Sequence, residues 1–122
     1  MVSDKPSERF GKADRICSRI EFERIFKTGR VQADPVLVIH ALPNQLNHSR
    51  LGISISKKVG SAPVRNRWKR LIREAFRRQR TEIPTGMDFI VRPRAGAIAD
   101  GEEIKRSLVR SARVLSRRRD GG

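Results

Sequence analysis

The sequence contains one cysteine and no tyrosine, and none of its apolar runs approaches the length of a membrane span. A single cysteine excludes a disulfide framework and any metal site built from several thiolates. A membrane-spanning helix needs about 20 apolar residues, so no bilayer crossing is predicted. The first ten residues are polar and charged and lack the apolar stretch of a secretory signal. With 122 residues, the chain is expected to form one small, soluble, cytoplasmic domain.

Acidic residues are also scarce. The chain has 28 Lys and Arg against 13 Asp and Glu, a formal charge of +15. No acidic residue occurs between Asp34 and Glu74, although that segment carries eight cations, and a second basic cluster occupies residues 105–119. A surface that merely keeps the protein in solution needs far less net charge. A polyanion is the expected partner, because each neutralised phosphate releases condensed counterions.

Hydrophobic periodicity predicts helices over residues 18–28, 61–80 and 100–115 and strands over residues 36–42, 51–56 and 87–91. The first two strands are expected to pair as a hairpin. Residues 1–15 are interpreted as a flexible basic arm, residues 16–116 as the folded domain that binds the polyanion, and residues 117–122 as an Arg/Gly-rich tail. The order helix, strand, strand, helix, strand, helix predicts an α+β fold, a compact single-domain α/β sandwich.

The helix predicted over residues 61–80 carries eight cations and one acid, Glu74. Its apolar residues form one stripe, so most of the cations lie on the opposite face. Like charges on one face destabilise an isolated helix, and a phosphate partner would reverse that cost. Seven of the eight cations are arginine, whose planar guanidinium suits phosphates. The alternative is a membrane-surface or calmodulin-target segment. The position of this helix between two strands argues against that alternative.

Groups able to perform catalysis are not evident. His40 lies in a predicted strand and His48 in a turn, and neither has a cysteine or carboxylate at ligand spacing. No Ser-His-Asp set and no carboxylate cluster for two metal ions is visible. The residues alone therefore predict neither a catalytic residue nor a metal site in this chain.

The segment SKKVGSAPVRNRWKRLIREAFRR, residues 56–78, closely resembles the signature of the bacterial ribonuclease P protein subunit, and the triplet Arg65-Asn66-Arg67 is its most distinctive part. The segments FERIFKTG (22–29), RLGISIS (50–56) and DFIVRP (88–93) resemble other parts of that family. The resemblance extends from about Phe22 to Leu115.

This resemblance implies a function. The chain would be the noncatalytic subunit of ribonuclease P, an endoribonuclease that removes the 5′ leader of precursor tRNA to give the mature 5′ end. Its partners would be the ribonuclease P RNA and precursor tRNA, with one protein monomer per RNA. The RNA would perform the hydrolysis with magnesium ions that it mainly holds, and the protein would help the complex to hold them. The family fold is an α/β sandwich with a left-handed β-α-β crossover, an exception to the usual right-handed rule.

The resemblance also assigns roles to residues. The RNA-binding positions would be Lys57, Lys58, Arg65, Asn66, Arg67, Lys69, Arg70, Arg73 and Arg77. The cleft for the leader would contain Phe22, Phe26, His40, Ser54 and Ser56. From the residues alone, two phenylalanines four apart are more often a core contact. His40 stands where the family often has an aromatic residue, so leader binding is expected to depend more on charge and less on stacking.

Three other functions fit parts of this pattern. A structural ribosomal or RNA-chaperone-like protein would need neither the Arg-Asn-Arg triplet at a helix start nor the phenylalanine pair. A protein-only nuclease would need clustered carboxylates. A DNA-binding module would need side chains free to contact base edges, whereas the central helix is almost uniformly cationic and suits phosphates.

Overall fold

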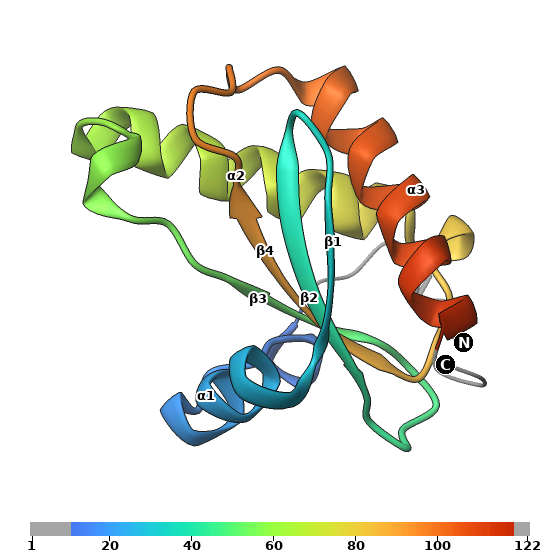
Figure 1. The fold of residues 1–122 in the computed structure, drawn as a ribbon. Helices are drawn as coiled ribbons and strands as arrows, with labels where there is room; N and C mark the ends of the chain where they lie inside the picture. The colour runs from blue at the N-terminus through green and yellow to red at the C-terminus, as the bar shows by residue number, and fades with distance from the viewer. Residues whose placement is uncertain (1–10, 119–122) are drawn as a thin grey trace.

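The computed structural model describes residues 11–118. Within that range, three α-helices, four strands and three 3-10 turns follow one another along the chain (Figure 1). Their bounds are η2 Lys12–Asp14, α1 Arg19–Thr28, β1 Arg30–Ala33, β2 Leu37–Pro43, β3 Arg50–Ile53, η3 Lys57–Val59, α2 Ala62–Arg78, η4 Arg80–Glu82, β4 Met87–Pro93 and α3 Gly101–Arg118.

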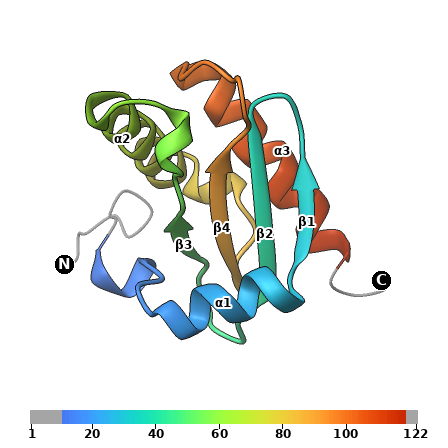
Figure 2. The ribbon, with the colours of Figure 1, turned by 60° about the vertical axis from the view of Figure 1, so that its left-hand side comes forward.

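The strands form one sheet in the order β1-β2-β4-β3, with helices on both faces. The helices α2 and α3 cover one face, and α1 lies across the other (Figure 2). Alternate strand residues, such as Ile39 and Phe89, enter the larger core beneath α2 and α3. A smaller core of Ile16, Ile25 and Ile90 lies beneath α1. The predicted α+β sandwich is confirmed.

The two strands expected to form a hairpin do not pair with each other. In the structure β2 pairs antiparallel with both β1 and β4, and β3 pairs parallel with β4. The hairpin partner of β2 is β1, a strand of only four residues that the sequence pattern did not reveal. The alternation in residues 51–56 shows which side chains share a face, but it carries no information about the neighbouring strand. The regular strand also ends earlier, at Ile53.

The parallel strands β3 and β4 are joined through α2. Figure 2 looks onto the sheet from the α1 side. In this view both strands point upward, β4 lies to the right of β3, and α2 lies behind the sheet. A crossover with this arrangement is left-handed, as the resemblance implied.

The helix starts follow the predicted chemistry at two of three places. Ser18 caps α1 by accepting a hydrogen bond from the Glu21 N–H at 3.4 Å. Asp100 does the same for α3, accepting from the Glu103 N–H at 3.1 Å. Ser61 precedes α2 without making a side-chain cap, and the proline in the first turn of α2 is the start signal that remains.

The folded part begins before residue 16. Lys12–Asp14 form a 3-10 turn, Arg15 pairs with Leu51 beside β3, and Asp14 makes an ion pair with Arg80 at 3.1 Å. Residues 11–15 are therefore not part of a flexible arm, and residues 1–10 lie outside the described range. At the other end, α3 continues through the first two residues of the expected tail. Residues 119–122 also lie outside it.

A buried ion pair connects β3, β4 and α1. Asp88 is almost fully buried, and Arg50 donates to both of its carboxylate oxygens, at 2.9 and 2.6 Å. Arg50 also reaches Glu21 on α1 at 3.0 Å, and the Asn44 side chain donates to Asp88 at 2.9 Å. Hydrogen bonding to Asp88 raises the pKa of Arg50 above its already high value. The network fixes β3 beside β4 and attaches α1 to the sheet.

A second carboxylate attaches α3 to the turn between β1 and β2. Asp34 accepts hydrogen bonds from the backbone N–H groups of Val36 and Leu37, at 2.8 and 2.9 Å. Ser107 and Arg110 on α3 both donate to its other oxygen at 2.6 Å. Burial alone would raise the pKa of Asp34, but these hydrogen bonds outweigh it and lower the pKa to about 2.

Replacing Asp88 by alanine is predicted to destabilise the domain by about 3 to 5 kcal/mol, because Arg50 would keep its partly buried charge without its main partner. Urea unfolding followed by circular dichroism measures the change. Glu23→Ala is the control, since its ion pair with Arg19 is exposed and should contribute less than about 1 kcal/mol. Equal losses in the two variants would contradict the role given to the buried pair.

The stability contributed by Asp34 should depend on pH. A carboxylate with a lowered pKa stabilises the fold above its ordinary value of 3.8 and loses that contribution as the pH falls toward about 2. Asp34→Asn should therefore remove about 2 kcal/mol of the fall in unfolding free energy between pH 5 and pH 2. Urea titrations across this range test the prediction. A profile for Asp34→Asn that parallels wild type would refute it.

Candidate nucleic-acid interface

One face of α2 presents cations away from the core. Asn66, Lys69, Arg70, Arg73 and Arg77 follow one another at helical spacing, and we call them the α2 cationic face. The buried residues of the same helix, which occupy the opposite arc, are Trp68, Ile72, Ala75 and Phe76. The stripe read from the sequence is thus confirmed, and the core positions this face toward solvent.

Most of this face, and the two lysines of the preceding turn η3, are unpaired within the described part of the chain. Side chains without a hydrogen-bond or ion-pair partner there are those of Lys57, Lys58, Asn66, Lys69, Arg70 and Arg73. Arg77 differs, because it donates to Glu74 at 2.9 Å. Hydrogen bonds from Arg78 and then Arg77 lower the pKa of Glu74, which keeps this carboxylate charged. The unpaired cations can therefore meet an anionic partner without first losing an internal ion pair.

Two arginines of the distinctive triplet make contacts with the protein itself. Arg65 is half-buried and donates to the Gly60 carbonyl at 2.8 Å. Arg67 is exposed and donates to the Ala99 carbonyl, in the loop before α3, at 3.3 Å. Both residues were expected to face RNA, and the structure adds a second role for them. Arg65 attaches the turn before α2 to this helix, and Arg67 attaches the loop before α3 to it.

The turn before α2 presents two further cations. Ser56 accepts a hydrogen bond from the Lys58 N–H at 3.0 Å and starts the 3-10 turn η3, in which Lys57 and Lys58 are exposed. Gly60 ends the turn with φ of 156°, where a Cβ would also lie 2.9 Å from Val64. Glycine at this position therefore allows the chain to pass directly from the two lysines into α2.

The predicted cleft aromatics lie together on the α1 side of the sheet. The Phe22 and Phe26 ring centroids are 6.2 Å apart, and the His40 ring meets Phe26 edge-on with centroids 4.7 Å apart. Phe22 rests on Gly52 so closely that a Cβ there would come within 2.7 Å of its ring. Phe26 remains 37% exposed, so part of its ring is available to a ligand. The same contacts also pack α1 onto the sheet.

His40 is buried, and neither of its ring nitrogens has a hydrogen-bond partner. Burial, together with the positive charge of Arg92, lowers the pKa of His40. The ring is therefore a neutral imidazole at pH 7. Both nitrogens are covered by neighbouring atoms, so the imidazole packs against the Phe26 ring.

Ser54 and Ser56 line a small cavity of about 140 Å³ where β3 leads into η3. Arg92 and Pro93 at the end of β4 complete it with Ile55 and Val59. The structure therefore brings both predicted serines to one place. It also adds Arg92, which sequence reasoning missed because a single cation at the end of an apolar strand carries no local signal of function.

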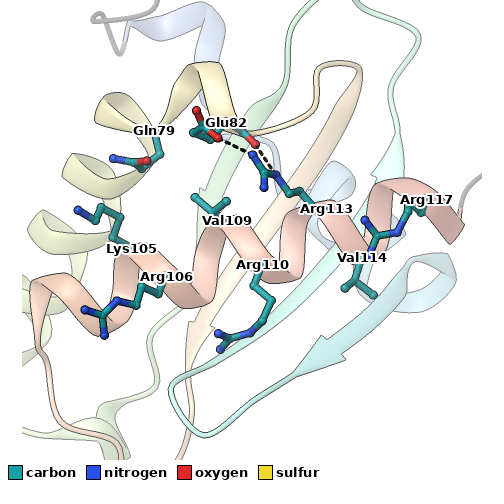
Figure 3. Close-up of a pocket in the computed structure, with 9 residues that line it drawn as sticks. All are labelled: Gln79, Glu82, Lys105, Arg106, Val109, Arg110, Arg113, Val114 and Arg117. Atoms are coloured by element: carbon teal, nitrogen blue, oxygen red, sulfur yellow. Dashed lines mark hydrogen bonds and ion pairs between the residues drawn. The ribbon is translucent and has the colours of Figure 1, made fainter.

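A larger groove, of about 570 Å³, lies between α3 and the end of α2 (Figure 3). Its cations are already paired with carboxylates in four of five cases. The pairs are Lys105 with Glu102, Arg106 with Glu103, Arg110 with Asp34 and Arg113 with Glu82. The fifth is Arg117. The charge of this groove is largely balanced, so the α2 cationic face is the better candidate for binding a polyanion.

The helices in the described part of the chain are too short or too polar to span a membrane. Comparison with known proteins gives the family. The family model described as Ribonuclease P matches residues 10–116. The chain belongs to the ribonuclease P protein family. It is accordingly a protein subunit of ribonuclease P, part of an endoribonuclease complex whose RNA is its partner.

Individual relatives agree with this assignment. The ribonuclease P protein component of Bacillus mycoides is 39% identical over 100 residues, which cover 80% of this chain and 87% of that protein. The protein component of Thermotoga maritima is 41% identical over 88 residues, covering 72% and 75%. The solved structure of the Staphylococcus aureus RNase P protein superposes with a TM-score of 0.74 at 38% identity, covering 84% of this chain and 95% of that one.

Proposed function

We propose that this chain binds the ribonuclease P RNA through the α2 cationic face and the η3 lysines. The observation that supports this most directly is the distribution of charge partners. Every carboxylate in the described part of the chain is engaged in an ion pair, a helix cap or a buried network. Lys69, Arg70 and Arg73 have no such partner. Phosphates would supply it, and the released counterions would favour the complex.

The cleft predicted on the α1 side of the sheet suits a different part of the RNA. Phe26 offers a partly exposed ring, and the buried imidazole of His40 supports that ring from beneath with an edge-on contact. Single-stranded RNA is bound by stacking on aromatic rings and by hydrogen bonds to unpaired bases. We therefore assign this cleft to the single-stranded 5′ leader of precursor tRNA. Ser54 and Ser56 would line its far end.

The hydrolysis itself is assigned to the RNA, in a complex of one protein and one RNA. Magnesium ions would supply the activated water and stabilise the leaving oxygen there. The residues of this chain support that division. Within residues 11–118 no group of three or more His, Cys, Asp or Glu side chains is placed to hold a metal ion, and the carboxylates already have partners. The chain would orient substrate and RNA.

The experiment that tests this proposal is cleavage of a precursor tRNA at low magnesium concentration. Three samples are compared: protein alone, ribonuclease P RNA alone, and the two together. We expect cleavage at the mature 5′ end in the mixture and not with protein alone. Cleavage by the protein alone would place an active site in this chain. An absence of stimulation in the mixture would instead favour a purely structural RNA-binding protein.

Replacing Arg70 and Arg73 together by glutamine should weaken binding of the ribonuclease P RNA and reduce its dependence on salt. Each lost phosphate contact lowers the slope of log K against log salt by roughly 0.7 to 0.9, so the pair should lower it by about 1.5. Filter binding at four salt concentrations measures the slope. Lys105→Gln with Arg106→Gln removes the same charge from paired cations on α3 and should change the slope much less. Identical slopes in all three proteins would exclude the α2 cationic face as the phosphate contact.

A further inference from the structure

The face of the sheet beneath α1 is arranged in two rows of side chains. In the lower row, the strand register places Ile90 between Gly52 and His40, and α1 covers this row with Phe22 and Phe26. In the upper row, Arg92 lies opposite Val38 of β2. On the other side of Arg92 lies Ser54, which follows β3 and whose N–H donates to the Val91 carbonyl at 3.1 Å. The upper-row residues Val38, Arg92 and Ser54 are all half-buried.

Arg92 is an unpaired cation in the upper row. Its Nε is buried without a hydrogen-bond partner, and no carboxylate of the described residues makes an ion pair with it. Arg50, the cation near the opposite end of the same face, is in contrast held by both Asp88 and Glu21. A half-buried guanidinium without a counter-ion costs free energy. An anion would remove that cost.

The cavity beside Arg92 has the chemistry of an anion site. Its volume of about 140 Å³ is lined by the hydroxyl-bearing residues Ser54 and Ser56 together with the Arg92 side chain. Hydroxyl and guanidinium groups both donate hydrogen bonds to phosphate oxygens, and the planar guanidinium can donate two in parallel. The exposed Lys57 and Lys58 follow Ser56 directly.

We propose that Arg92, with the hydroxyl groups of Ser54 and Ser56, binds one phosphodiester group of a single-stranded RNA that crosses the sheet. This inference rests on the proposed function of the cleft and adds a residue to it. His40 lies two residues along its strand from Val38, the partner of Arg92, which is a distance of about 7 Å. A strand whose phosphate is held at Arg92 can therefore place a neighbouring nucleotide over the exposed part of Phe26, whose ring packs against His40. In this arrangement the upper row contacts the phosphate through charge, and the lower row contacts the base through an aromatic ring.

The test compares Arg92→Gln with wild type in binding a short single-stranded oligouridylate, measured by fluorescence anisotropy. A charge-assisted phosphate contact is worth about 1.5 kcal/mol or more, so we expect affinity to fall at least about tenfold. Arg94→Gln is the matched control. Arg94 lies two residues after Arg92, and its exposed side chain donates only to the Asp34 carbonyl. This variant removes the same charge and should lower the affinity by less than about threefold. Arg92→Lys should restore part of the loss, because it keeps the charge without the planar fork.

Two further measurements identify the phosphate as the group that is bound. An oligouridylate with neutral methylphosphonate linkages should bind wild type about as weakly as the natural oligomer binds Arg92→Gln. Burial is the main cause of the lowered pKa of His40, and the positive charge of Arg92 is the second. In an NMR titration, the oligomer should raise this pKa in wild type, because a phosphate on Arg92 offsets that second cause. The same addition should leave the His40 pKa unchanged in Arg92→Gln.

The outcomes separate this inference from the proposed function. Equal affinities for wild type, Arg92→Gln and Arg94→Gln would overturn the role of Arg92 and leave the cleft as a leader site that uses rings alone. Equal binding of the methylphosphonate and natural oligomers would also overturn it. If wild type fails to bind the oligomer while still binding the ribonuclease P RNA, both this inference and the leader role of the cleft are overturned. The assignment of the α2 cationic face would then stand.

Discussion

The ion pair of Asp88 and Arg50 joins the elements from which both proposed binding surfaces are built. It fixes β3 parallel to β4, although the two strands are separated in sequence by the whole of α2. Because β3 is held at the sheet edge, η3 and the start of α2 emerge beside the open end of the α1 face. The same guanidinium reaches Glu21 and so attaches α1 across the lower row. The aromatic cluster and the cavity at Arg92 both depend on that placement.

A chain with more than twice as many cations as acids has few carboxylates to use, and their positions divide its cations into two groups. Asp34, Glu82, Glu102 and Glu103 neutralise α3, and Glu74 holds two arginines near the end of α2. The first three turns of α2 contain no acid at all. Repulsion along those turns is tolerated because the buried stripe around Trp68 and Ile72 holds the helix onto the sheet. The fold thus bears the electrostatic cost of a surface that a polyanion would stabilise.

Local patterns predicted the helices well and the sheet poorly, for a physical reason. The α2 stripe repeats within a few turns, and Ser18 and Asp100 act on N–H groups three residues away, so each signal lies within a short segment. Strand pairing joins residues about 40 apart, such as Leu51 with Phe89, and no alternation within one strand identifies its partner. For that reason β1 was missed, the hairpin was wrong, and residues 11–15 were separated from the fold. Arg92 was missed as well, because its significance comes from Ser54 and His40 on two other strands.

The two surfaces proposed to bind RNA differ in what they could distinguish. On α2, unpaired cations face solvent with no ring among them, and such a surface responds to the density of phosphates and to their spacing. On the α1 side, the partly exposed ring of Phe26 would accept a planar group, and a folded duplex with its bases stacked inside would present none for it to contact. Arg65 fixes the turn between these two regions, because it donates to the Gly60 carbonyl just after η3. A strand of RNA bound along the cleft and a folded RNA bound along α2 would therefore meet at the η3 turn, where Lys57 and Lys58 are exposed to both.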